Sequence, residues 1–460
     1  MIMGEYIANI WKSYREVVSF SVMGALLVYI GFGQSWALAL GIFNLCVISS
    51  IMALGVNIQW GYAGLFNVGI MGFTALGGLA VVIVSQQPVV EAIDAGGLGM
   101  LVSIALIILT VAVSLYLHKN KYNKWWVIIS VVVGFIAIRY FYSDATRAIE
   151  AVNTAKTGYL GGLGLPVVFS WIVGGMLAAG AAWIIGKISL GLRSDYLAIA
   201  TLGISEIVLY IIKNEDWLAR GVKNVTGLQR PVPYELKLQQ AEWFQDLVRW
   251  IHQSKFTLAD QLEHTREFSI LVSESSVVFV KLCYAGIFLS VLISMIVMAN
   301  LALNSPWGRK VRAIRDNEVA ASAMGKDIVR QHLQIFVIGS AIAGVAGALL
   351  VTYTGQFVPT SYQPLRFTFL IWVMVIVGGS GNNLGSVIGA FVIWFFWIES
   401  GPMGLWLAET VKDIYGSGNP VSDFLYEKAH FLRLVLMGSV MLLVLRFSPG
   451  GMFPEKSKEL

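Results

Sequence analysis

Apolar runs long enough to cross a lipid bilayer recur along almost the whole chain, and this pattern constrains the fold more than any other feature. A membrane-spanning helix needs about 20 mostly apolar residues, with a range of roughly 17–25. Several of the runs are short, so some are expected to be half-helices or re-entrant segments. The pattern predicts an all-α polytopic membrane protein, one transmembrane domain over residues 1–460 with about 10 to 12 transmembrane helices, including short or broken ones. The runs cover residues 17–32, 36–56, 63–84, 98–117, 125–142, 165–185, 196–212, 277–301, 333–353, 367–378, 384–399 and 431–446.

The composition excludes several other classes of protein. Of the 460 residues, 57% are apolar and 13% are charged, whereas about 25% of a typical soluble domain is charged. Because a soluble chain of this length has no way to hide so much apolar surface, a cytosolic globular enzyme, a disordered protein and a nucleic-acid-binding module are excluded. Cys46 and Cys283 both lie inside apolar runs, so we expect no disulfide framework and no thiolate metal site.

Loop charge predicts the orientation, because Lys and Arg gather in the cytoplasmic loops of membrane proteins. Residues 302–332 carry six basic side chains, and residues 118–124 carry three lysines. The short loop 85–97 has two acidic residues and no Lys or Arg. With twelve alternating spans, the basic loops and both the N-terminus and the C-terminus are cytoplasmic.

Two loops are predicted on the opposite side of the membrane. Residues 213–276 form a long polar insertion, and residues 401–430 form the second loop. Within the first, stretch 238–252 has apolar residues at helical spacing: Leu238, Trp243, Leu247, Trp250 and Ile251. This pattern favours either a helix lying on the outer surface or a helix capping the outer mouth.

No catalytic motif is recognisable in the chain. Gly186-Lys187 is followed by Ile188 and lacks the earlier glycine, so the phosphate-binding loop pattern fails. HExxH and GxSxG motifs are absent, and the five histidines are scattered in or beside loops. The chain is therefore predicted not to be an enzyme and to bind no metal. Any active transport would draw on an ion gradient or on a partner ATPase.

The cytoplasmic loop 302–332 carries the most information about function. Ser305-Pro306 predicts a helix start, with a capping hydroxyl followed by proline at the first helical position. Trp307, Val311 and Ile314 then form one apolar stripe at helical spacing.

A second short helix is predicted directly after the first. Asp316 is expected to cap it, Glu318 lies in its first turn, and Gly325 is expected to end it. Residues 320–323 give this helix a smooth surface of small side chains. Such a helix either docks into the groove of a partner or lies on lipid headgroups as an amphipathic connector.

The motifs of the chain resemble those of one family of bacterial importers. The stretch from Glu318 to Gly325 resembles the EAA loop of ATP-binding-cassette importer permeases, the loop that docks on the ATPase. The longer string SPWGRKVRAIRDNEVAASAMGKDI from Ser305 resembles the branched-chain amino-acid permeases, specifically their M-type (LivM-like) subunit. Four further stretches agree in order: GYAGLFNVG from Gly61, LRSDYLAIATLG from Leu192, GGSGNNLG from Gly378 and RFSPGG from Arg446. Stretches 95–160 and 229–276 look like additions to the family core.

This resemblance implies a multi-pass permease of the bacterial inner membrane that binds no cofactor itself, with ATP and Mg used by partner ATPases. The implied partners are a second, H-type permease, two ATPases, a periplasmic amino-acid-binding protein and the lipid bilayer, with no nucleic acid. The implied solutes are leucine, isoleucine and valine or related compounds. Loop 213–276 would be periplasmic, and residues 306–325 would transmit motion from the ATPases. The coupling residues are predicted to be Arg312, Arg315, Asp316, Glu318, Ala320, Ala321 and Gly325.

Polar residues at membrane depth are candidates for the translocation path. Broken helices with exposed backbone bind polar solutes within membranes, and amides flank two glycine-rich breaks here. Glu206 lies in the middle of an apolar segment, where a carboxylate either faces a water-filled path or packs against a polar neighbour. Thr226, in the GVKNVTG segment beyond that helix, faces either the path or the binding protein. The predicted path residues are Asn57, Gln59, Gly61, Gly64, Asn67, Glu206, Thr226, Gly381, Asn382 and Asn383.

Two other transport mechanisms remain open at this level. An ion-coupled secondary transporter acting alone would need paired intramembrane charges, and Glu206 is the one clear candidate found in the sequence. A channel would need a ring-forming selectivity motif, and none is evident. Transport without nucleotide would favour either of these over an ATP-driven importer.

Overall fold

The computed structural model describes residues 2–153, 158–192, 194–252, 261–415, 420–428 and 431–455. Helices dominate it, in agreement with the predicted all-α class. The elements are α1 (Ile2–Gly33), α2 (Trp36–Ala63), α3 (Ile70–Ser85), α4 (Val90–Ala92), the π-helical turn η1 (Ile93–Gly97), α5 (Leu98–Lys119), α6 (Lys124–Val152), α7 (Val168–Ser189), α8 (Ser194–Asn214), α9 (Asp216–Ala219), β1 (Val225–Thr226), α10 (Glu235–Gln240), α11 (Glu242–Ile251), α12 (Gln261–Asn304), α13 (Pro306–Asp316), α14 (Glu318–Ala323), α15 (Ile328–Thr354), β2 (Gln356–Phe357), the 3₁₀ turn η3 (Pro359–Ser361), α16 (Pro364–Gly378), α17 (Asn383–Tyr415), α18 (Pro420–Lys428) and α19 (Leu432–Phe447).

Within the described residues, nine helices are long and apolar enough to cross a membrane. Three shorter apolar helices accompany them, namely Ile70–Ser85, Arg366–Gly378 and Leu434–Phe447. The prediction of a polytopic membrane protein with about 10 to 12 spans, some of them short or broken, is confirmed.

Two segments differ in their boundaries from the sequence prediction. The run 63–84 was expected to be one span, but α2 continues to Ala63 and α3 begins only at Ile70. The predicted loop 401–430 is mostly helix, because α17 continues through Pro402 to Tyr415 and α18 follows. The additional residues of α2 are mostly buried, so tertiary packing prolongs this helix beyond the purely apolar run. The additional residues of α17 are mostly exposed.

The predicted insertion 213–276 contains more helix than its polarity indicates. The 44-residue α12 begins at Gln261, and residues 253–260 lie outside the described part. The 238–252 stretch splits at Ala241 into α10 and α11. The predicted apolar face is wrong in detail, since Phe244 and Val248 are buried while Trp243 and Trp250 are exposed.

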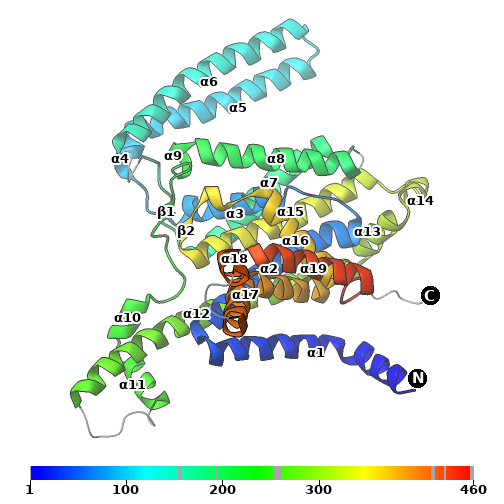
Figure 1. Ribbon diagram of the computed structural model, residues 1–460. Coiled ribbons are helices and arrows are strands. Elements are labelled where there is room, and N and C mark those ends of the chain that lie inside the picture. Colours follow the sequence, from blue (N-terminus) through cyan, green and yellow to red (C-terminus); the bar gives the residue numbers. More distant parts are fainter. Residues whose placement is uncertain are drawn as a thin grey trace.

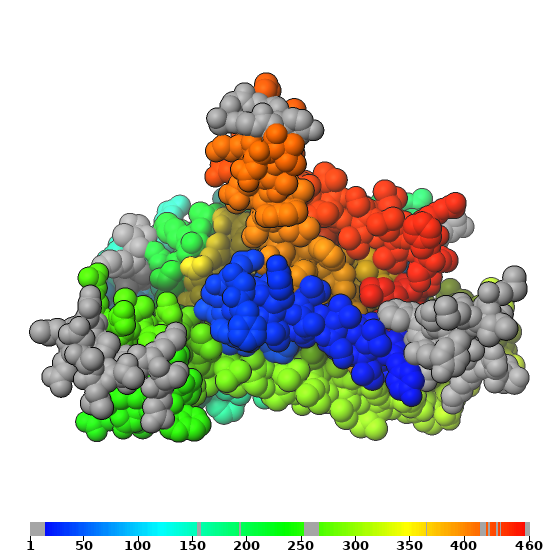
Figure 2. Space-filling model, turned by 60° about the horizontal axis from the view of Figure 1, so that its bottom comes forward, coloured from blue at the N-terminus to red at the C-terminus, as the bar shows by residue number. Residues whose placement is uncertain are grey.

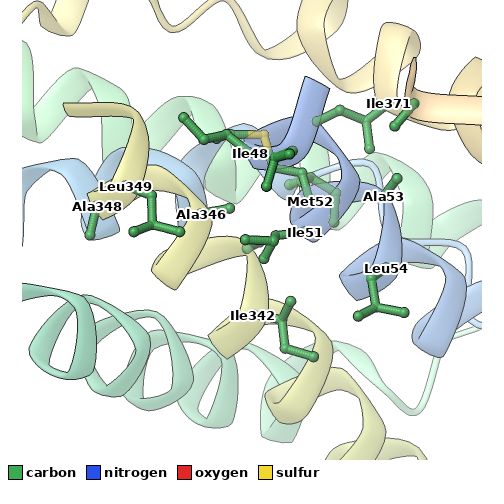
Figure 3. Close-up of a cluster of buried hydrophobic side chains, with 14 of the residues drawn as sticks. Ile48, Ile51, Met52, Ala53, Leu54, Ile342, Ala346, Ala348, Leu349 and Ile371 are labelled. Carbon is green, nitrogen blue, oxygen red and sulfur yellow. The ribbon is translucent and has the colours of Figure 1, made fainter. Parts of the chain in front are cut away.

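Helices α2, α3, α7 and α15 form the centre of the molecule. Their apolar side chains interlock around Ile48, Ile51, Ile342 and Leu349 (Figure 3). Small residues allow close contact between backbones. A Cβ at Gly77 would lie 1.8 Å from the carbonyl oxygen of Gly344, so only glycine fits there. The spaced small residues of the sequence therefore serve helix packing.

The two ends of the helix bundle are built differently (Figure 1). Both chain ends lie at the same end as α13 and α14. The opposite end carries α10, α11 and a two-stranded antiparallel pair in which Val225 is aligned with Phe357. This short pair is a departure from the predicted all-helical fold, but it involves only four residues.

Two helical arms leave the main body. The α5–α6 hairpin leans away from it (Figure 1), and most of its apolar side chains are exposed, as expected for helices surrounded by lipid. The later part of α17 projects outward together with α18 (Figure 2). These arms leave the central bundle and its polar residues as the region to search for a functional site.

Candidate functional site

Helix α13 is anchored on the bundle as its sequence predicts. The Ser305 hydroxyl accepts a hydrogen bond from the Trp307 backbone N–H at 3.2 Å, and Pro306 is the first helical residue. Val311 and Ile314 are buried, and the Trp307 indole donates to Gln334 of α15 at 2.9 Å. One face of α13 is therefore fixed against the membrane-spanning body.

Helix α14 begins one residue later than predicted. Asn317, not Asp316, caps it, because the Asn317 side-chain oxygen accepts from the Ala320 backbone N–H at 2.9 Å. Asp316 is the last residue of α13, where its carboxylate can only pair with its neighbour Arg315. Asparagine and aspartate are equally good caps, so the sequence did not distinguish them.

Most of α14 faces away from the protein. Only Ala321 is buried, whereas Glu318, Val319 and Ala320 are exposed. Val319 and the following Met324 are 80% and 78% exposed, and the chain then turns at Gly325 with a φ of 71°. The helix thus presents a small, partly apolar knob at the end of the molecule that carries both termini.

Arg315 connects this knob to the membrane-spanning body. Its guanidinium forms ion pairs with Glu455 at 2.9 Å and with Asp316 at 3.1 Å, and it donates to the backbone carbonyl of Gly61 in the last turn of α2. Partial burial lowers the pKa of Arg315, but the hydrogen bonds and charges of Glu455 and Asp316 outweigh it, so the pKa is raised above its ordinary value. Nearby, Arg312 donates to the carbonyl of Leu303 at 2.9 Å.

The amides predicted for the translocation path form two bonded groups at the breaks between helices. In the first, Asn57 accepts from the Gly381 backbone N–H at 2.9 Å and donates to Asn383 at 3.1 Å. Asn383 donates in turn to Asn300 of α12 at 2.8 Å. Asn382 caps α17 by accepting from the next two backbone N–H groups, those of residues 384 and 385.

The second group holds the break between α2 and α3. Gln59 donates to the Phe336 carbonyl at 2.8 Å and to Ser340 at 3.1 Å, and it accepts from Asn67 at 2.9 Å. The Trp372 indole donates to the Asn67 backbone carbonyl at 3.1 Å. Both groups are called the amide core below; its members are Asn57, Gln59, Asn67, Asn300, Asn382 and Asn383.

Glycines make the amide core compact. A Cβ at Gly61 would lie 2.4 Å from the Gly381 nitrogen and 2.3 Å from the Asn57 oxygen. Gly64 and Gly381 have φ angles of 71° and 81°, which favour glycine. Asn57, Gln59, Asn67 and Asn383 are buried. The structure brings these predicted path residues together, and in this conformation their polar groups bond to the protein itself.

Glu206 and Thr226 lie apart from the amide core. Thr226 is exposed in β1, opposite Gln356 of β2. Glu206 is exposed on α8 and lines a groove of about 700 Å³, whose other walls come from α16, α17 and α19. Lys213 and Arg366 line the same groove. We call this surface the α8–α16 groove.

A separate apolar cavity of about 370 Å³ lies between α2, α3, α15 and α16. Ile48, Met52 and Ile371 line it, next to the packed core of Figure 3. No member of the amide core lines this cavity. Among the described residues, no group of three or more His, Cys, Asp or Glu side chains is arranged to hold a metal ion.

A bundle of apolar spans with broken helices defines a polytopic membrane protein. A family model described as "Branched-chain amino acid transport system / permease component" matches residues 127–445. The chain therefore belongs to this permease family. The match begins at residue 127, inside the stretch 95–160.

Individual relatives agree with this assignment and with the LivM-like resemblance. The probable branched-chain amino acid transport permease protein LivM of Methanocaldococcus jannaschii is 33% identical over 156 residues, 34% of this chain and 41% of the relative. The high-affinity LivM permease protein of Escherichia coli is 25% identical over 334 residues, 72% of this chain and 67% of the relative. A probable LivH permease of M. jannaschii is 29% identical over 110 residues, 23% of this chain and 34% of that protein. No solved structure matches the chain significantly.

Several residues that complete these sites were not found in the sequence. Glu455, Asn300, Trp372 and Arg366 lie far along the chain from their partners, outside every quoted motif. Arg366 did carry a signal, because it is a base next to a short apolar run at 367–378. Its place in the same groove as Glu206 depends on how α8 and α16 pack.

Proposed function

We propose that this chain is the membrane-spanning permease subunit of an ATP-binding-cassette importer that carries branched-chain or related amino acids across the bacterial inner membrane. It would work beside a second, H-type permease, two ATPases and a periplasmic binding protein. The ATPases would use ATP and Mg, and this chain would bind no cofactor. The end that carries α13 and α14 would face the cytoplasm.

The exposed α14 is the observation that carries the proposal. A short helix held out from the bundle, with small side chains between two exposed apolar residues, suits insertion into a groove of a partner. Val319 and Met324 would be the apolar anchors, and Glu318 would remain at the rim. An amphipathic connector lying on lipid headgroups would instead have its apolar side toward the membrane-spanning body.

The contacts of Arg315 support a route for the motion. Helix α14 follows α13 directly, so a displacement of α14 would also move α13. Arg315 joins α13 to the last turn of α2 and to Glu455. Gly61, which accepts from Arg315, packs on Gly381 in the turn before α17. Movement of the cytoplasmic helices would thus act on both breaks between helices at the same time.

The substrate class rests on the relatives. Those named LivM are branched-chain amino acid permeases, and the similarity to a LivH permease supports a second subunit of related architecture. In importers of this kind a binding protein selects the solute. The permease must then pass a zwitterion with an apolar side chain.

The test is co-purification from cells that express the neighbouring genes. Gly325→Trp places a bulky side chain beside α14, so we expect the ATPases to be lost while membrane insertion is retained. Gly227→Trp is the matched control, because both glycines have similar positive φ angles (71° and 74°) and open space around a Cβ. Gly227 follows β1, at the opposite end of the molecule.

Normal co-purification of the ATPases with Gly325→Trp would contradict the docking assignment. Recovery of the wild-type chain alone, with uptake driven by an ion gradient, would contradict the importer. It would instead support a secondary transporter in which Glu206 takes part in ion coupling.

A further inference from the structure

The α8–α16 groove carries charges that the coupling end and the amide core do not explain. Glu206 lies in the middle of α8, eight residues before its last residue, Asn214. At 1.5 Å per residue this is about 12 Å from the end of the helix. A carboxylate at this depth that faced lipid would be costly, so it is expected to face water, a solute or a partner.

Arg366 faces the same groove from α16. It lies in the first turn of that helix, and its guanidinium is 5.1 Å from the ring centre of Trp397 on α17. Such a cation–π contact holds the guanidinium in place without neutralising its charge. Lys213, seven residues after Glu206, lines the groove nearer the end of the molecule that carries β1 and β2.

These charges are not paired with one another. Across the described ranges, Glu206, Lys213 and Arg366 form no ion pair with any side chain. Elsewhere in the chain an arginine does form an ion pair, since Arg315 pairs with Glu455. The groove thus keeps one acidic and two basic groups available for something outside this chain.

Apart from Tyr362 and Gln363, the rest of the lining is apolar. Phe369 and Leu370 of α16 and Leu434 and Met437 of α19 complete the walls. An apolar groove with a few charged groups is the general form of a site for a small amphipathic solute. Its open side lies on the surface of the chain, where a second subunit would close it.

We propose that the α8–α16 groove is this chain's half of a passage for zwitterionic amino acids, in which Glu206 receives the α-ammonium group and Arg366 the α-carboxylate. The planar guanidinium of arginine matches a carboxylate with two parallel hydrogen bonds. Phe369, Leu370 and Met437 contact the apolar side chain of the solute. Lys213 attracts the carboxylate toward the entrance. This assignment rests on the proposed function and names the residues that perform it.

The experiment uses the complete importer in proteoliposomes, with radiolabelled leucine and a saturating amount of binding protein. Wild-type uptake that depends on ATP is the first requirement, and its absence would contradict the proposed function itself. When wild-type uptake is present, Glu206→Gln and Arg366→Gln are expected to lower the initial rate about tenfold or more, as for one lost charge-assisted hydrogen bond.

Matched controls come from other exposed charges on long helices. Arg139→Gln on α6 and Glu409→Gln on α17 remove the same kinds of charge outside the groove, and uptake should stay within about twofold of wild type, as for surface substitutions. Retention of the second permease and of ATPase stimulation in the groove variants is also expected. The conservative variant Arg366→Lys should recover part of the lost rate.

Two results would overturn the proposal. Uptake at the wild-type rate in both groove variants would show that the solute does not contact these charges. Loss of the second permease from the purified variants would show that the charges bind that subunit and not a solute.

Water access provides an independent measurement. A Glu206→Cys side chain should react with a charged, membrane-impermeant thiol reagent, and leucine with ATP should slow the reaction. Ile207→Cys is the control, since Ile207 is exposed but does not line the groove. Equal reaction at both positions, or none at Glu206→Cys, would contradict a water-filled passage.

Discussion

The amide core and the α8–α16 groove are two polar regions inside one apolar bundle, and they are built in opposite ways. In the amide core, Asn57 and Gln59 bond to other parts of the protein and are fully buried. In the groove, Glu206 and Arg366 are exposed and unpaired among the described residues. Satisfied amides stabilise broken helices, whereas unsatisfied charges at membrane depth are available for a ligand.

This comparison assigns different expected phenotypes to the two regions. Substitutions in the amide core should lower the stability of the protein, with transport lost as a consequence. Substitutions in the groove should lower transport and leave stability unchanged. The variants below are ordered by their expected effect on stability.

Asn57→Leu should have the largest effect. It leaves the Gly381 backbone N–H and the Asn383 side-chain oxygen without partners, and each buried unsatisfied group costs about 1–3 kcal/mol. The free energy of unfolding should therefore fall by about 2–6 kcal/mol. Thermal unfolding in detergent measures this change. Asn120→Leu, at an exposed position between α5 and α6, is the control. If the two variants were equally stable, the result would contradict a structural role for the amide core.

Gly61→Ala tests the close packing of the two helix breaks. The added methyl group would meet the Gly381 nitrogen at 2.4 Å, and overpacking of this kind costs about 1–3 kcal/mol. Gly180→Ala on α7 is a matched control, because nothing lies within 4 Å of a Cβ there. We expect Gly180→Ala to be as stable as the wild type or slightly more stable. The same thermal unfolding assay compares the stability of the two variants. A Gly61→Ala protein as stable as the wild type would contradict the close contact between Gly61 and Gly381.

Arg315→Gln tests the connection between α13 and the membrane-spanning body. A double-mutant cycle with Glu455→Gln should give a coupling energy of about 0.5–1 kcal/mol, because the ion pair is partly exposed. The larger effect should be functional, since the ATPases would stay bound while the amount of solute carried per ATP falls. The ratio of solute carried to ATP hydrolysed is obtained by measuring uptake and ATP hydrolysis in the same proteoliposomes. An unchanged ratio would rule out Arg315 as a transmitting contact.

Glu206→Gln should have the smallest effect on stability, within about 0.5 kcal/mol of zero, as for an exposed position without a partner. Assembly with the other subunits should also persist, while leucine uptake slows. The comparison of unfolding temperature with uptake rate in one preparation checks both statements. A clear loss of stability with normal uptake would place Glu206 among the packing residues and make the two regions alike.

Local features of the chain were predictable where neighbouring residues decide them. The cap at Ser305, the buried stripe of Val311 and Ile314, and the end of α14 at Gly325 all follow from residues within one or two turns. The break after Gly64 was indicated by glycine and amides, but its limits were not. The helix boundary depends on packing of the last turn of α2 against the turn before α17.

The choice between Asp316 and Asn317 as the cap of α14 shows where local information ends. Both residue types cap helices well. In the structure Asn317 is the cap, and Asp316 ends the last turn of α13 beside Arg315, which is bonded to Gly61 and Glu455. Those partners are more than a hundred positions away in the chain.

The sequence by itself determined the membrane-spanning class, the approximate number of spans, the start of α13 and the turn that ends α14, because hydropathy and capping depend on adjacent residues. Only the tertiary structure decided which polar groups are satisfied. Asn57 and Glu206 are equally unusual in an apolar run, but one meets Gly381 and Asn383 while the other faces a groove with Arg366. The difference arises from which helices pack side by side, and short-range sequence patterns do not encode that arrangement.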